Sequence, residues 1–339
     1  KDPDDSDFVY RQAIRAKAFD ALRGLLPAAS LSNVGIYGTG QAYEALLLRM
    51  RSHPLPEART YADLILHELR KVIPSFLKRV DLADRGVAWS TYLATNRTAM
   101  DEVADRLFPA DTPADGAPVV TLTDFDPEAE VKLVTAMLYA HTHVPETQVE
   151  ARVRAMSAQD RLGVVAAYVG DRSNRRHRPG RALERIDYRF DVLADYGAFR
   201  DLQRHRMLTV EWQQLSPRHG FTRPESIDLA GETETFDAAM ARSAALHDLL
   251  EPRFPAQAPY AVALAYKVRF VMQMNAREAM HVLELRSGPQ GHPAYREVAQ
   301  QMHRLVAEQA GHHAVAEMMR YVDHAPEPSL ERLEAERRA

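Results

Sequence analysis

The chain has 339 residues, of which 46% are hydrophobic and 27% are charged, a composition that suits a folded protein with room for two domains. Its 43 lysines and arginines are outnumbered by 47 acidic residues, so general coating of nucleic acid is excluded unless the cations are locally concentrated. Cysteine is absent, which excludes disulfides, thiolate zinc sites and a cysteine nucleophile.

The first 110 residues predict a mostly helical segment. The N-terminal Lys1-Asp2-Pro3-Asp4-Asp5 is unlike a secretory signal, and no apolar run reaches the length of a membrane span, so a cytoplasmic protein is expected. An apolar stripe at helical spacing runs from Ala58 to Val72, and Pro74 ends it. The glycines from Gly35 to Gly40 lack the strand–glycine–helix context of a dinucleotide-binding fingerprint, and we interpret them as a loop.

A linker separates this segment from a second domain. Residues 108–118 contain three prolines and a glycine without apolar periodicity. After them, residues 119–122 predict a strand, and Asp126 with Pro127 predicts a helix cap. Alternation from Ile186 to Val192 predicts a half-buried strand, and helical spacing from Val192 to Gln203 predicts a helix. We therefore expect an α+β fold, a mixed sheet with long helices over 119–339, preceded by a helical domain over 1–113.

Two short strings in the second domain carry the strongest functional signal. Arg204-His205-Arg206 and Asn275-Ala276-Arg277 stand about seventy residues apart, and the second leads into Arg286 on the same predicted helix. The planar guanidinium fork grips phosphate or carboxylate through two donors at once. Several arginines with an amide and an imidazole therefore indicate a site for a phosphorylated ligand.

Other polar clusters leave alternatives open. The arginines between Arg172 and Arg185 fit a solvated surface and an anionic-ligand site about equally, while a nucleic-acid module is less favoured because interleaved stacking aromatics are missing. His141 with His143, and His312 with His313, lack a fixed carboxylate spacing, so no metal is expected.

A faint internal repeat links the two segments. An offset of 237 places Arg49 over Arg286 and Pro56 over Pro293. Chance similarity between amphipathic helices is the alternative, and the shared order of helix, arginine and proline favours duplication.

In their order, Arg204-His205-Arg206, Ser216-Pro217-Arg218 and Asn275-Ala276-Arg277 with Arg286 resemble the signature of the flavin-dependent thymidylate synthases. The match covers roughly residues 119–320, and residues 1–113 resemble a degenerate copy of the family's C-terminal half. The resemblance implies a flavoprotein methyltransferase of dTMP biosynthesis. It would bind FAD, take a methylene group from methylenetetrahydrofolate to C5 of dUMP or a related nucleotide, and use NADPH as reductant.

The resemblance also implies residue roles. Arg286 would be catalytic and contact the uracil. The cofactor would be held by Arg204, His205, Arg206, Asn275, Arg277 and His281. The substrate would be held by Gln214, Ser216, Arg218, Arg286 and Arg23.

Arg23 comes from the other segment, four residues before Pro27, as in the family's phosphate-binding pattern. The resemblance implies sites assembled from several subunits, so we expect a homo-oligomer. Because each chain would contain two fused copies, a dimer of chains would correspond to the usual tetramer. No membrane partner is expected, and a nucleic-acid partner is disfavoured.

Several positions depart from the family pattern. Nine residues separate Arg206 from Ser216 where the family has seven, and Asp201, Gln214 and His281 replace a glutamine, an acidic residue and an asparagine. The alternative prediction is therefore a non-catalytic or altered-substrate flavoprotein kept for assembly.

Overall fold

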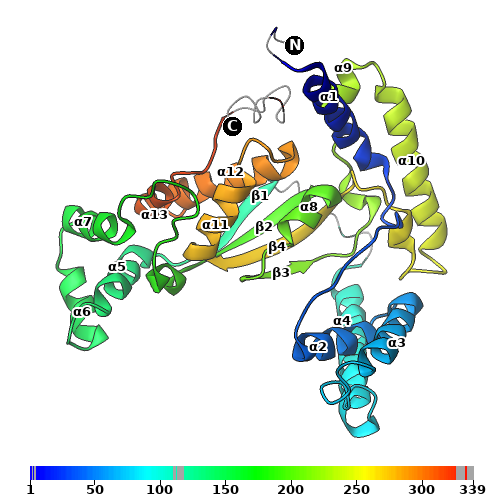
Figure 1. The fold of residues 1–339 in the computed structure, drawn as a ribbon, viewed down its shortest axis with the longest axis horizontal. Helices are drawn as coiled ribbons and strands as arrows, with labels where there is room; N and C mark the ends of the chain where they lie inside the picture. The colour runs from blue at the N-terminus through cyan, green and yellow to red at the C-terminus, as the bar shows by residue number, and fades with distance from the viewer. Residues whose placement is uncertain (2, 4, 110–111, 113–117, 326–332, 334–339) are drawn as a thin grey trace. The chain divides into compact units, whose positions relative to one another are not determined.

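The computed structural model describes residues 1, 3, 5–109, 112, 118–325 and 333, which form two compact units (Figure 1). Unit 1 is built from Lys1–Ala28, Ala117–His247 and Ala261–Ala339, and unit 2 from Ala29–Gly116 and Asp248–Tyr260. The predicted α+β class is confirmed, since a mixed architecture of helices and one sheet is present. In the described part of the chain, no helix combines the length and the apolar character needed to cross a membrane.

The sheet of unit 1 has four antiparallel strands in the order β1-β2-β4-β3. The strands are β1 (Val120–Phe125), β2 (Asp187–Asp195), β3 (Leu208–Trp212) and β4 (Lys267–Asn275). Each central strand alternates buried apolar side chains with more polar ones, as a sheet with one covered face requires. The buried positions are Tyr188, Phe190, Val192 and Ala194 in β2, and Val268, Phe270, Met272 and Met274 in β4. The predicted strand from 186 to 192 is confirmed.

Helices cover that apolar face and flank the sheet. Helices α8 (Tyr196–Leu202) and α11 (Ala276–Arg286) pack on β2 and β4, and α12 (Pro293–Glu308) packs on β1 and β2. Figure 1 shows α5 (Ala129–Tyr139), α6 (Glu146–Arg154), α7 (Ala158–Val169) and α13 (His313–Met318) beyond one end of the sheet. Helices α1 (Asp7–Leu22), α9 (Glu225–Leu229) and α10 (Thr233–Leu250) lie beyond the other. Short turns complete the unit: η1 (Arg23–Leu25), η3 (Arg181–Arg185) and η4 (Pro217–His219). The turn η5 (Ala258–Ala261) belongs to unit 2 except for its last residue.

Unit 2 is helical, as the first segment predicts. It contains α2 (Gly40–Arg51), α3 (Pro56–Arg70), a π-helical turn η2 (Ala83–Val87) and α4 (Ala88–Leu107). Its small core consists of Leu47, Ala62, Leu66, Leu77 and Val80. The stripe from Ala58 to Val72 corresponds to α3, which ends before Pro74.

The helix pairs that the repeat relates share a local contact. In unit 2, Arg59 near the start of α3 donates to the carbonyl oxygens of His53 and Pro54 at 2.6 and 2.8 Å. In unit 1, Arg296 near the start of α12 donates to the carbonyl oxygen of Ser287 at 3.0 Å. Each arginine follows a proline at the first helical position and ties its helix to the preceding connection.

Some boundaries differ from the sequence-based expectation. The helix predicted from Val192 begins only at Tyr196, because residues up to Asp195 pair with β4 and the Asp195 side chain then caps α8 by accepting from the Ala198 amide at 2.8 Å. Asp126 does not cap a helix. It forms a turn with Glu128, and α5 begins at Ala129.

The domain limits differ as well. Residues 1–28 belong to unit 1 rather than to the helical segment, because the backbone near Pro27 pairs antiparallel with that of Ala263. Most of the predicted linker, 110–111 and 113–117, lies outside the described residues.

Candidate functional site

The site is built where α11 leaves β4 beside the loop between α8 and β3. Asn275 ends β4 and caps α11, its side chain accepting from the Glu278 amide at 2.9 Å. The loop carries Arg204, His205 and Arg206. The Nε of Arg286 donates to Nε2 of His205 at 3.0 Å, so the two strings meet across 81 residues of sequence.

Arg286 is held from three sides. Besides His205, its Nη2 donates to the carbonyl oxygen of Asp201 at 2.5 Å, and its Nη1 lies 3.7 Å from the Asp201 carboxylate. The guanidinium carbon is 5.4 Å from the centre of the Tyr295 ring. The side chain is only 14% exposed. A guanidinium in this setting is partly dehydrated and oriented, which strengthens its interaction with a neighbouring anion or carbonyl.

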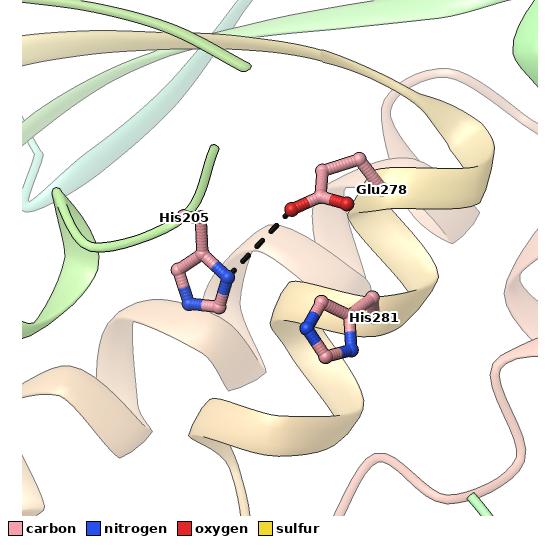
Figure 2. Close-up of side chains that lie close together, drawn as sticks. All are labelled: His205, Glu278 and His281. Carbon is pink, nitrogen blue, oxygen red and sulfur yellow. Dashed lines mark ion pairs between the residues drawn. The ribbon is translucent and has the colours of Figure 1, made fainter. Parts of the chain in front are cut away.

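Figure 2 shows His205 facing Glu278 and His281, which lie three residues apart on α11. Nδ1 of His205 is 3.7 Å from the Glu278 carboxylate, and the two imidazole rings meet edge to face with centres 5.5 Å apart. One ligand atom from each residue lies within 4.8 Å of the others, a spacing that can hold a metal ion. This cluster is not among the groups predicted from the sequence, although Glu278 and His281 have the Glu-x-x-His spacing that places two ligands on one face of a helix.

Charge and burial set the state of His281. Burial lowers the pKa of its ring, the nearby cation of Arg178 lowers it further, and Glu278 opposes this in part. Nη2 of Arg178 lies 3.3 Å from Nδ1 of His281. The ring is therefore neutral at pH 7.

The remaining predicted cofactor residues divide into two groups. Arg204 and Arg206 are exposed on the loop, and Arg204 is 3.4 Å from the Asp201 carboxylate. Arg277 points instead toward the segment before β2, where its Nε donates to the Pro179 carbonyl oxygen at 3.1 Å and its Nη1 lies 3.3 Å from Glu184.

The predicted substrate-binding residues Gln214, Ser216 and Arg218 follow the far end of β3. Ser216 caps η4, its hydroxyl accepting from the Arg218 amide at 3.4 Å, while Gln214 and Arg218 are exposed. Leu208 and Gln213 both bond to β4, so about 16 Å of strand separate the His205 end from the Ser216 end. The structure of unit 1 does not bring Ser216 next to Arg286.

Arg23 lies in unit 1 and meets the N-terminus of α8. Its Nη2 atom is buried and has no hydrogen-bond partner among the described residues. A Cβ on Gly197 would lie 3.6 Å from this nitrogen, an ordinary van der Waals distance, so the guanidinium lies directly beside the start of α8. Burial raises the pKa of the nearby Asp195 carboxyl, an effect that the charge of Arg23 partly offsets.

His292 connects the Arg23 region with the Arg286 region. It caps α12, Nδ1 accepting from the Ala294 amide at 3.3 Å. Burial, followed by the charge of Arg23, lowers the pKa of His292 to about 4, while Asp20 and Asp201 act in the opposite direction. The charges of Arg23 and Asp201 therefore both act on the His292 ring.

Arg172 is a structural residue, which resolves the alternatives left open for it. Its guanidinium pairs with the Glu284 carboxylate through two bonds of 2.7 Å, and the two side chains are 2% and 1% exposed. It also donates to the carbonyl oxygens of Met318 and His177 at 2.7 and 2.6 Å. Arg172 is therefore neither solvated nor free to bind an anion, and it fastens the segment after α7 to α11.

Comparison with known proteins gives consistent results. The model of a family described as thymidylate synthase complementing protein matches residues 120–312. A UPF0159 protein of Chlamydia muridarum is 34% identical over 339 residues, covering 100% of this chain and 63% of the relative. A UPF0159 protein of Chlamydia pneumoniae is 37% identical over 295 residues, covering 86% and 55%. The chain thus spans less than two thirds of the length of these relatives.

Among solved structures, a flavin-dependent thymidylate synthase of Helicobacter pylori, complexed with FAD and dUMP, is similar with a TM-score of 0.40 and 18% identity, covering 55% of this chain and 93% of that one. The family match extends from β1 through β4 and α11 to the end of the segment after α12, just before α13, and so includes both arginine strings. The predicted family resemblance is confirmed: the chain belongs to the thymidylate synthase complementing protein family.

Proposed function

We propose that this chain is a flavin-dependent thymidylate synthase that transfers a one-carbon unit from methylenetetrahydrofolate to C5 of dUMP or a related pyrimidine nucleotide. The observation that carries the proposal is Arg286, a partly dehydrated guanidinium held by His205 and Asp201 inside the family-matched region. Addition at C5 requires negative charge to build on the pyrimidine carbonyl groups, and an oriented guanidinium stabilises that charge. The absence of cysteine is consistent with this electrostatic mode of activation.

The residues present suit FAD. The exposed guanidinium groups of Arg204 and Arg206 can reach a pyrophosphate, and the buried His205 offers a ring to the isoalloxazine region. Asn275 and His281 come from the first turns of α11, on which Glu278 and His281 face His205, whereas Arg277 on the same helix is directed toward Pro179 and Glu184. When bound, the flavin supplies the hydride, and NADPH is the proposed reductant.

Arg23 supports a nucleotide phosphate near the same region. A buried guanidinium nitrogen without a partner is costly, and a phosphate oxygen would satisfy it. Ser216 and Arg218, with Gln214, form the second proposed phosphate contact at the other end of β3.

We propose that a complete site needs a second copy of the chain. About 16 Å of strand separate the Ser216 end of β3 from the Arg286 end, so one copy supplies each half of a shared pocket. The similar contacts of Arg59 and Arg296 support the proposal that unit 2 derives from a duplicated C-terminal half. Light scattering on the purified chain tests this proposal. A dimer is expected, in which the two units of each chain take the places of the four subunits of a tetramer.

The decisive experiment is release of tritium from C5-labelled dUMP by the FAD-loaded protein with methylenetetrahydrofolate and NADPH. Release that depends on folate supports the proposal. Labelled UMP and dCMP in parallel reveal which pyrimidine nucleotide is accepted.

One observation favours a second candidate, a non-catalytic flavoprotein. Asp201, which replaces the glutamine expected there, places a carboxylate 3.7 Å from Arg286 and offsets part of its charge. A yellow protein that binds flavin but releases no tritium from any of the three nucleotides would support this alternative.

A further inference from the structure

The His205–Glu278–His281 cluster has two arginines on its outer side. Arg286 contacts Nε2 of His205 at 3.0 Å, and Arg178 contacts Nδ1 of His281 at 3.3 Å. The ring nitrogen of His205 that faces the cluster is Nδ1, at 3.7 Å from Glu278. Figure 2 shows the carboxylate next to this nitrogen.

The two arginine contacts determine where the imidazole protons are. A guanidinium only donates hydrogen bonds, so a ring nitrogen that it contacts must offer a lone pair. Nε2 of His205 is therefore unprotonated, and the proton of the neutral ring is on Nδ1, facing Glu278. By the same argument, the proton of neutral His281 is on Nε2.

This arrangement opposes a metal ion in the cluster. A metal would need the Nδ1 lone pair of His205, which would move the proton to Nε2, against the Nε–H of Arg286. Histidine ligands usually donate their second N–H to an acceptor, whereas here both outer nitrogens receive donors. The positive charges of Arg286 and Arg178 add electrostatic repulsion.

We propose that Glu278 is a positioning residue that holds Arg286 in place through His205. The carboxylate lies 3.7 Å from Nδ1, too far for a direct hydrogen bond, but its negative charge favours the tautomer with the proton on Nδ1 and so keeps the Nε2 lone pair directed at Arg286. Glu278 is itself fixed, because it stands in the first turn of α11, where the helix dipole favours an anion and the Asn275 cap holds its amide. The chain thus contains a guanidinium–imidazole–carboxylate relay, and its consequence for turnover rests on the proposed function.

NMR spectroscopy on the full-length protein with labelled histidine and arginine tests the relay without any assay of activity. In wild type, the His205 ring should show a protonated Nδ1 and an unprotonated Nε2. In Glu278→Ala, His205 should become a mixture of tautomers, and the Arg286 Nε–H should exchange with water about tenfold faster, as loss of one hydrogen bond implies. The matched control is Glu297→Ala, an exposed glutamate on α12, which should leave both signals unchanged.

A second variant separates positioning from general support of the fold. In His205→Gln, the side-chain oxygen can accept from Arg286 without any help from a carboxylate. Adding Glu278→Ala to this variant should therefore leave the Arg286 signal unchanged. If Glu278→Ala loosens Arg286 equally in both backgrounds, the effect does not pass through His205 and the relay is wrong.

A separate experiment tests whether the cluster binds a metal ion. Zn²⁺ or Fe²⁺ added to the wild-type protein should leave the His205 and His281 signals unchanged. Binding that shifts both signals and is abolished by Glu278→Ala would overturn the proposal in favour of a metal site.

An activity assay gives a further test. Glu278→Ala should lower kcat more than it raises KM, and Glu278→Gln should recover part of kcat. If the NMR outcomes hold but no variant or wild type turns over, the relay stands and the proposed function fails.

Discussion

Burial decides what each arginine can do in this chain. Arg172 is buried and fully paired, Arg286 is partly buried and oriented, and Arg204 and Arg206 are exposed. Arg172 therefore stabilises the fold, Arg286 can stabilise charge on a ligand, and the exposed Arg204 and Arg206 are accessible to the proposed anionic cofactor.

Removing one partner of the buried Arg172–Glu284 pair should destabilise the fold more than replacing both partners. Glu284→Ala leaves a buried guanidinium without its counter-ion and should lower the free energy of unfolding by about 3–5 kcal/mol. The double variant Arg172→Met with Glu284→Leu should be less destabilised than Glu284→Ala. Urea unfolding followed by circular dichroism measures both, and Glu150→Ala, which breaks an exposed pair with Arg154, should cost less than about 1 kcal/mol. Equal losses for Glu284→Ala and Glu150→Ala would contradict this assignment.

Arg286→Lys tests the proposed catalytic contact. Lysine keeps the charge but loses the planar fork, so tritium release should fall by about 10²–10³-fold, in the range seen when one oriented donor is removed. Flavin absorbance should remain close to that of wild type. Arg154→Lys, at an exposed position, is the matched control, and wild-type turnover in Arg286→Lys would rule out the assigned role.

At the scale of elements, helix starts organise the site. Asn275 caps α11, Asp195 caps α8 and His292 caps α12, and each of these residues also stands next to a proposed functional side chain. The cap of α11 thus sets the start of the helix that carries His281 and Arg286, and the cap of α8 lies beside Arg23.

Loss of the α11 cap should affect both stability and binding. Asn275→Ala removes the acceptor for the Glu278 amide and should cost about 1 kcal/mol of stability. Because the first turn then frays, flavin content after purification should also fall. Asn275→Asp keeps an acceptor and should restore the stability, and if it behaves like alanine the capping explanation is wrong.

The cap of α12 predicts a pH dependence. Since the folded-state pKa of His292 is lowered to about 4, its contribution to stability is complete above pH 6.5 and is lost as pH falls from 6.5 toward 4. Between pH 7 and 5, wild type should lose up to about 2 kcal/mol more than His292→Asn, which caps without titrating. Urea unfolding at both pH values provides the measurement, and parallel losses in the two proteins would contradict it.

At the scale of the whole molecule, the proposed pocket draws on two copies. Arg218→Ala and Arg286→Ala should each abolish turnover, because each removes one half of the site. When the two variants are co-expressed, mixed dimers regain one intact site, and about a quarter of wild-type activity should return for statistical mixing. Co-expression of Arg286→Ala with Arg286→Lys is the control and should restore nothing. A mixed sample of well-folded variants that stays inactive would show that the halves are not shared.

The sequence by itself determined the local structure and the family. Alternation of apolar and polar residues predicted β2, and the apolar stripe ended by Pro74 predicted α3. The ordered strings at 204–206 and 275–286 indicated the family whose model matches residues 120–312. These features depend on neighbours along the chain, or on short motifs that keep their order, and both can be read without coordinates.

Only the tertiary structure decided which arginine meets which partner. It buried Arg172 against Glu284, 112 residues away, brought His205 to Arg286, and placed Arg23 in the unit that contains α11. It also extended β2 to Asp195, where pairing with β4 prevailed over a helical spacing that looked favourable locally. Contacts of this kind depend on strand register and on the packing of distant helices, and no local pattern of residues encodes them.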